Sequence, residues 1–202
     1  MRIHWKSFLK RIGIFAVCGA MILTGSGLYG ESFAVKAPEE VSVIFTHDMH
    51  SHMDADRVSK DGSVVEVGGF GRLKTVMDQV KKDYPDSFVL DGGDFSMGTP
   101  YQTIFSKEAS ELRMMEYLGY EATTFGNHEF DYRARGLASM LEAATGRGPQ
   151  LVCANIDWEK TLQDESLKDD AKVLKDACDA YGVKDYTVLE HDGVRMAVFG
   201  LL

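Results

Sequence analysis

The apolar residues of this chain fall into short runs that alternate with longer amphipathic stretches. Val41–Phe45, Ser87–Leu90 and Ala122–Phe125 are apolar or β-branched nearly throughout, which is typical of strands that are covered on both faces of a sheet. Gln150–Ala154 continues the series as a fourth run of the same kind. We therefore expect four strands with helices between them.

The stretches between these runs carry apolar residues three and four positions apart, which is the spacing of one helix face. Pro85 and Gly119 end the first two of these helices, and the acidic segment 157–180 is expected to be mostly helical with a solvated outer face. Strands that alternate with helices indicate an α/β fold. The apolar faces are Phe70, Leu73, Met77, Val80 and Tyr84; Phe105, Ala109, Leu112 and Met115; and Leu137, Met140, Leu141 and Ala144.

Two further segments are predicted to contain no helix: one is a hairpin and the other a loop. Asp192-Gly193 lies between Tyr186–Glu190 and Val194–Leu201, and this dipeptide is a strong signal for a two-residue hairpin turn. The hairpin adds antiparallel strands, so the predicted sheet is mixed. The polar stretch Ser51–Ser63 is interpreted as a loop on the substrate side.

Polar side chains that can bind metal ions follow three of the predicted strands. Asp48 and His50 come after the first strand, Asp94 after the second, and Asn127 after the third. Ligands in open α/β sheets gather outside the carboxyl ends of the strands, so these loops are expected to converge. Carboxylate, imidazole and amide donors together suit zinc, manganese or a similar divalent ion.

The chain is organised around Phe125–Asp131, which reads Phe-Gly-Asn-His-Glu-Phe-Asp. Asp131 lies three residues after His128, so its carboxylate can hold one ring nitrogen while the other nitrogen faces a substrate. The alternative is an ordinary polar turn between a strand and a helix, with Asn127 and Asp131 as turn and cap residues. The two further loops with metal-binding side chains favour the catalytic interpretation.

Three motifs in this order resemble those of the calcineurin-like metallophosphoesterases. They are Thr46–His50, Gly93-Asp94 with Gly98-Thr99, and Gly126–Glu129. The longer strings resemble the secreted 5′-nucleotidase branch, which includes UDP-sugar hydrolases and 2′,3′-cyclic phosphodiesterases. The resemblance runs from Val41 to the end of the chain. It implies an α/β fold with metallophosphatase-type mixed β-sheets flanked by helices, a four-layer α/β/β/α arrangement of which this chain holds about the first half.

The resemblance also implies a role for each matching residue. Asp48 and His50 would hold one divalent ion, and Asp94 would bridge two. Asn127 would hold the second ion and contact the substrate, a small phosphate ester such as a nucleotide. His128 would assist the leaving oxygen, oriented by Asp131. His47 stands where the branch usually has asparagine, at a position that is not a usual ligand.

Parts of the family pattern do not occur in these 202 residues. The family completes its two-metal site with later histidines, and its nucleotidase branch carries a C-terminal nucleotide-binding domain. Residues 35–202 are therefore expected to be the incomplete N-terminal part of a metallophosphoesterase domain. Expressed alone, they are expected to bind at most one ion and to show little activity. The alternatives to a nucleotide phosphohydrolase are a truncated or non-catalytic fragment and a related sulfur-ester hydrolase.

Residues 1–34 have the layout of a secretory signal peptide. Four basic residues come first, then the apolar run Ile12–Leu23, and then Ser32-Phe33-Ala34 as a small-x-small cleavage site. Cleavage after Ala34 predicts a secreted, periplasmic or cell-surface protein without a stable membrane partner; a retained N-terminal anchor is the lesser alternative. The formal charge of the whole chain is −9, and this acidity excludes a surface that binds duplex nucleic acid.

Two cysteines follow the predicted cleavage site, which excludes a disulfide-rich scaffold. Cys153 and Cys178 could form a disulfide after export. Cys178 shares an apolar helical face with Leu167, Ala171 and Leu174, which favours a buried free thiol.

Overall fold

The computed structural model describes residues 40–202. Its centre is a parallel sheet of four strands in the order β1-β4-β5-β6. The strands are β1 (Val43–Thr46), β4 (Phe88–Asp91), β5 (Ala122–Thr123) and β6 (Gln150–Leu151). Each predicted strand is present, although β5 and β6 are only two residues long. Because the strands are parallel, the loops after β1, β4 and β5 leave the sheet at the same edge.

Helices connect these strands, as the apolar spacing predicts. After β1 the chain forms a hairpin and then the helix α1 (Phe70–Asp83), which leads into β4. The helix α4 (Arg133–Ala143) precedes β6. The acidic segment forms α5 (Trp158–Gln163) and α6 (Lys168–Tyr181), and α6 packs against α4. Two 3₁₀ turns, η2 (Pro100–Ile104) and η3 (His128–Phe130), lie in the segments after β4 and β5.

The helix predicted around Phe105–Met115 is interrupted. Its first turn is α2 (Phe105–Glu108) and its second part is α3 (Ser110–Leu118). Ala109 between them is fully buried and has a φ of 45°, a left-handed conformation that breaks an α-helix. The apolar spacing continues across the break, so the pattern alone did not reveal it.

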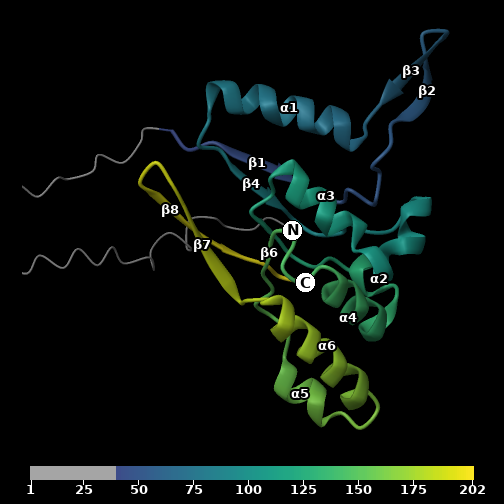
Figure 1. Ribbon diagram of the computed structural model, residues 1–202, viewed down its shortest axis with the longest axis vertical. Coiled ribbons are helices and arrows are strands. Elements are labelled where there is room, and N and C mark those ends of the chain that lie inside the picture. The colour runs from purple at the N-terminus through teal and green to yellow at the C-terminus, as the bar shows by residue number, and fades with distance from the viewer. Residues whose placement is uncertain (1–39) are drawn as a thin grey trace, which may run out of the picture. The chain divides into compact units, whose positions relative to one another are not determined.

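Both hairpins have a turn with two left-handed residues. Asp192 and Gly193 have φ values of 45° and 75° and join β7 (Tyr186–His191) to β8 (Val194–Phe199), which confirms the predicted turn. The second hairpin, β2 (Asp56–Lys60) and β3 (Ser63–Val67), extends beyond the first turn of α1 (Figure 1). The prediction of a loop over Ser51–Ser63 is therefore wrong from Asp56 onward.

The hairpin β7–β8 forms a two-stranded sheet of its own that adjoins the parallel sheet beyond β6. The expectation that this hairpin makes the central sheet mixed is therefore wrong, because all strand pairs of the four-stranded sheet are parallel. Val152 makes a parallel bridge with Lys184, and the Ala154 N–H donates to the Gly200 carbonyl at 2.8 Å. The core is one cluster of buried side chains from the helices and central strands. Its largest fully buried members are Phe95, Phe105, Phe125, Met77, Leu112, Met115, Leu137, Met140, Leu141 and Leu151.

Cys153 and Cys178 are both buried and both free. Burial raises the pKa of the Cys178 thiol to about 12, so this side chain behaves as a small apolar group at neutral pH. This result agrees with the buried free thiol that its helical face favours.

No helix within residues 40–202 is long and apolar enough to cross a membrane. The signal peptide predicted over residues 1–34 lies outside the described residues.

Candidate metal centre

The loops after β1 and β4 are joined by backbone hydrogen bonds. The Asp48 N–H donates to the Gly93 carbonyl at 3.0 Å, and the His50 N–H donates to the Asp94 carbonyl at 3.1 Å. Asp48, His50 and Asp94 have φ values of 52°, 47° and 51°. Residues with side chains seldom adopt this conformation, and such strain concentrates at functional sites. The two loops are thus held together in a conformation that the sequence does not favour locally.

Three of the predicted metal ligands converge at this edge of the sheet. One ligand atom each from Asp48, His50 and Asp94 lies within 4.8 Å of the others. The His50 Nε2 is 3.4 Å from the Asp48 Oδ1. Two carboxylates and an imidazole are hard and borderline donors of the kind that zinc and manganese accept. The residues present therefore fit a divalent ion.

His47 contributes to this cluster although it was not predicted as a ligand. Its Nδ1 lies 2.5 Å from the Asp48 Oδ2. This hydrogen bond is the largest cause of a lowered Asp48 pKa. A carboxyl group with a lowered pKa stays ionised, and the ionised form is the one that binds metal.

The loop after β5 approaches Asp94 closely because two glycines leave room for it. A Cβ at Gly93 would lie 2.6 Å from the Gly126 nitrogen, and a Cβ at Gly126 would collide with the Asp94 carboxylate. The His128 N–H donates to the Asp94 Oδ1 at 2.9 Å. This contact brings His128, and with it the preceding Asn127, close to the ligand cluster.

His128 and Asp131 form the predicted pair. The His128 Nδ1 lies 2.7 Å from the Asp131 Oδ2, and this bond is the main cause of a raised His128 pKa. The His128 ring meets the His50 ring edge to face, with 4.9 Å between the ring centroids. The imidazole is about one-third exposed, so the ring is both held in place and accessible.

Glu129 lies beneath the site and was missed by the sequence analysis. Its carboxylate is fully buried and accepts hydrogen bonds from the N–H groups of Asp94, Gly126 and Ser96 and from the Ser96 hydroxyl, at 2.6 to 3.0 Å. Burial raises the pKa of this carboxyl group, and the four hydrogen bonds oppose that rise. Glu129 thus joins the loop after β4 to the loop after β5.

Three other polar residues, His52, Asn155 and His191, are not among the three convergent ligands. His52 is exposed. Asn155 bonds through its side chain to the backbone of Leu202. The His191 Nε2 lies 2.5 Å from the Glu121 Oε1, an interaction that ties the β7–β8 hairpin to the parallel sheet. The side chains of Asn155 and His191 are thus engaged in contacts within the fold.

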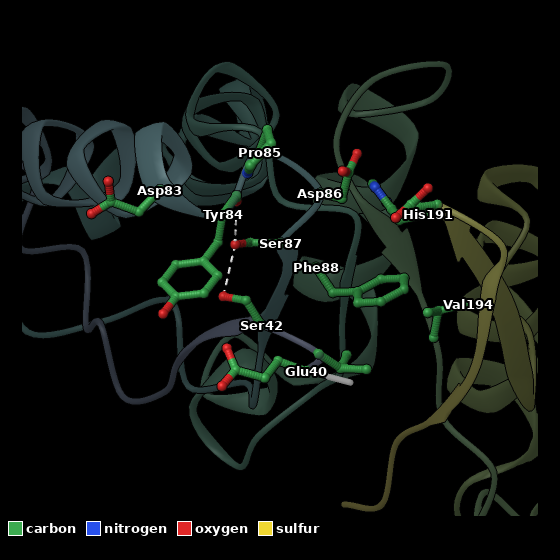
Figure 2. Close-up of a pocket in the computed structure, with 12 residues that line it drawn as sticks. Glu40, Ser42, Asp83, Tyr84, Pro85, Asp86, Ser87, Phe88, His191 and Val194 are labelled. Carbon is green, nitrogen blue, oxygen red and sulfur yellow. Dashed lines mark hydrogen bonds between the residues drawn. The ribbon is translucent and has the colours of Figure 1, made fainter. Parts of the chain in front are cut away.

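A pocket of about 160 Å³ lies at the opposite end of β1 and β4. Figure 2 shows that Ser42 and Ser87, which precede these strands, point toward each other there, with their hydroxyl oxygens 2.8 Å apart. Asp83, Asp86 and His191 also line this pocket. The expected metal ligands follow the strands and therefore lie at the other end of the sheet.

A parallel α/β sheet with carboxylate and imidazole ligands at its strand ends, and a histidine–aspartate pair beside them, is the architecture of metallophosphoesterases. The chain belongs to the calcineurin-like phosphoesterase family, whose sequence profile matches residues 41–195. Family membership implies divalent metal ions at the site, and it confirms both the resemblance and the fold class predicted from the sequence.

Several known proteins are similar to this chain. An NAD 5′-nucleotidase from Haemophilus influenzae is 27% identical over 197 residues, which is 95% of this chain and 30% of that protein. A mouse 5′-nucleotidase is 33% identical over 156 residues, or 75% of this chain and 27% of that protein. The structure of a 5′-nucleotidase precursor from Thermus thermophilus matches 80% of this chain with a TM-score of 0.63 and 26% identity. The chain thus spans less than a third of the length of these relatives.

Proposed function

We propose that the protein hydrolyses phosphate esters of nucleotides with the help of divalent metal ions. The observation that carries this proposal is the convergence of Asp48, His50 and Asp94 beside the His128–Asp131 pair. The substrate class is supported by the similarity to proteins named 5′-nucleotidase and NAD 5′-nucleotidase.

Asp48 and His50 would hold one ion, Asp94 would contact two, and Asn127 would contact the second. Asp94 suits a shared position because only its Oδ1 accepts the His128 N–H, and a carboxylate has further lone pairs on both oxygens. When bound, divalent ions supply positive charge to the phosphoryl oxygens and lower the pKa of a coordinated water.

His128 would act on the oxygen that leaves with the nucleoside. Its Nδ1 is engaged by Asp131, so the Nε2 can donate a hydrogen bond or a proton to that oxygen. Asp131 keeps the ring in one tautomer and orientation. Asn127, immediately before His128, would offer its side-chain amide to a phosphoryl oxygen. A general acid placed in this way contributes about 10²–10⁴-fold to the rate.

Hydrolysis should depend on metal in the natural protein that contains this sequence. We expect turnover of a nucleoside monophosphate with Mn²⁺ or Zn²⁺, a lower rate with a generic aryl phosphate, and loss of both on chelation. An aryl sulfate tests the sulfur-ester alternative in the same assay. Hydrolysis that persists after complete chelation would contradict the proposal, and a preference for the sulfate would favour the alternative.

We also propose that the protein is exported and cleaved after Ala34. Support comes from the basic start of the sequence, its apolar run and the small residues that follow. N-terminal sequencing of the protein collected outside the cytoplasm should read Val35 first. Soluble extracellular protein that still begins at Met1 would contradict this.

A further inference from the structure

Two successive residues of the loop after β1 have left-handed backbone conformations. His50 has a φ of 47° and Ser51 a φ of 54°. Among L-residues this conformation is uncommon and costs energy, whereas glycine adopts it readily. The His50 side chain can reach the ligand cluster only while this segment keeps its conformation. Something must therefore hold the segment in place.

Ser51 is fully buried, and each of its polar groups has a partner. Its N–H donates to the Phe95 carbonyl at 2.9 Å, and its carbonyl accepts from the Thr99 hydroxyl at 2.8 Å. Its hydroxyl donates to the Glu111 Oε1 at 2.7 Å. Phe95 and Thr99 both belong to the loop after β4, so only the hydroxyl links Ser51 to a helix.

Glu111 is a buried carboxylate on α3, outside the three metal-binding motifs and 60 residues from Ser51 along the chain. It is 1% exposed. Its Oε1 accepts from Ser51 and its Oε2 accepts from the Ser110 hydroxyl at 2.8 Å. A carboxylate that is buried away from water needs such hydrogen-bond donors. The donor from outside its own helix is Ser51, the residue next to His50. The carboxylate and the strained segment thus stabilise each other.

We propose that Glu111 is a positioning residue for His50, acting through the hydroxyl of Ser51. The hydrogen bond that the Ser51 hydroxyl donates to Glu111 fixes Ser51 in the left-handed region, and Ser51 in turn fixes the direction of the His50 side chain. This inference rests on the proposed role of His50 as a metal ligand. Partners one step removed from a ligand typically change metal affinity 10- to 100-fold when they are lost.

A purely structural role for Glu111 makes a different prediction. If Glu111 only fills the space between α3 and the loops, its loss should destabilise the protein whatever residue occupies position 51. If it holds Ser51 in a strained conformation, glycine at position 51 should make it dispensable, because glycine needs no support there. The double variant Ser51→Gly/Glu111→Met separates the two roles.

The experiment compares the wild type, Glu111→Met, the double variant and Ser87→Ala. Ser87→Ala is the matched control, since Ser87 is another fully buried serine whose hydroxyl bonds to Ser42 and Tyr84 at the far end of β4. Mn²⁺ affinity is measured by calorimetry, and thermal stability is measured in the absence of metal. The conformation of residues 50–51 is determined by crystallography. The three variants are made in the natural protein and compared with its wild type.

Glu111→Met should bind Mn²⁺ about 10- to 100-fold more weakly, with residues 50–51 displaced, and the double variant should recover most of the affinity. Ser87→Ala should lose stability but keep its Mn²⁺ affinity. Unchanged affinity in Glu111→Met, or no recovery in the double variant, would overturn the inference. A wild type that binds no Mn²⁺ would overturn the proposed function instead. An undisturbed His50–Ser51 backbone in Glu111→Met would then still refute the positioning role.

Discussion

Replacing Asp94 with alanine is expected to remove bound metal and turnover together, whereas replacing His128 with asparagine should leave the metal in place. Asp94 lies in the ligand cluster and also accepts the His128 N–H, so its loss takes away a ligand and a contact between two loops. The His128 side chain bonds instead to Asp131. His128→Asn should therefore lower kcat by about 10²–10⁴-fold. Metal content by mass spectrometry, measured beside kcat, separates the two outcomes.

His52→Asn is the control for the histidine. His52 is exposed and lies on the same loop as His50, so its replacement should alter neither metal content nor kcat. The assignment of roles would be wrong if His128→Asn lost its metal while the turnover per bound ion stayed normal. It would also be wrong if Asp94→Ala retained a full complement of metal.

The convergence of the site could be predicted because it follows from topology. Once Val41–Phe45, Ser87–Leu90 and Ala122–Phe125 are interpreted as neighbouring parallel strands, the residues after them must share one edge. The structure places Asp48, His50 and Asp94 there, with His128 beside them. The bond between His128 and Asp131 was likewise predictable, because their spacing is local.

The hairpin β2–β3 was missed although its signal is present. Asp61-Gly62 is the same dipeptide as the correctly predicted turn at Asp192-Gly193, and both turns have two left-handed residues. The strands beside Asp61 are exposed nearly throughout. A hairpin without a buried face lacks the alternation of apolar and polar residues that marks a strand, so only the turn could have revealed it.

Two of the buried carboxylates, Glu111 and Glu129, were harder to find, for different reasons. Glu111, Met115 and Leu118 are buried on one face of α3, and their spacing of four and three is that of the core. A glutamate in this position was a detectable sign of a buried charge. Glu129 lies in a short 3₁₀ turn, where no periodicity applies. Its burial depends on loops 30 or more residues away, which local sequence does not encode.

Replacing Glu129 should have the largest effect on stability, because its buried carboxylate is the acceptor of four hydrogen bonds. In Glu129→Ala, three backbone N–H groups and one hydroxyl lose their acceptor, two of them in buried and two in partly buried contacts, and each unsatisfied buried group costs about 1–3 kcal/mol. The sum is comparable to the whole stability of a typical domain, about 5–15 kcal/mol. Urea unfolding should therefore show Glu129→Ala to be largely unfolded, whereas Glu66→Gln, at an exposed ion pair with Arg72, should change stability by less than about 1 kcal/mol.

Glu129→Gln tests the same contacts without a cavity. The Glu129 Oε1 accepts hydrogen bonds from Ser96, and the Oε2 accepts them from Asp94 and Gly126. A glutamine amide in either orientation therefore directs its NH₂ group at a backbone N–H. We expect a folded but destabilised protein in which the loops after β4 and β5 separate and metal affinity falls. Wild-type stability and metal affinity in Glu129→Gln would show that the loops are held by their other contacts. A loss of stability with normal metal affinity would show that Glu129 supports the fold and does not set the position of Asp94.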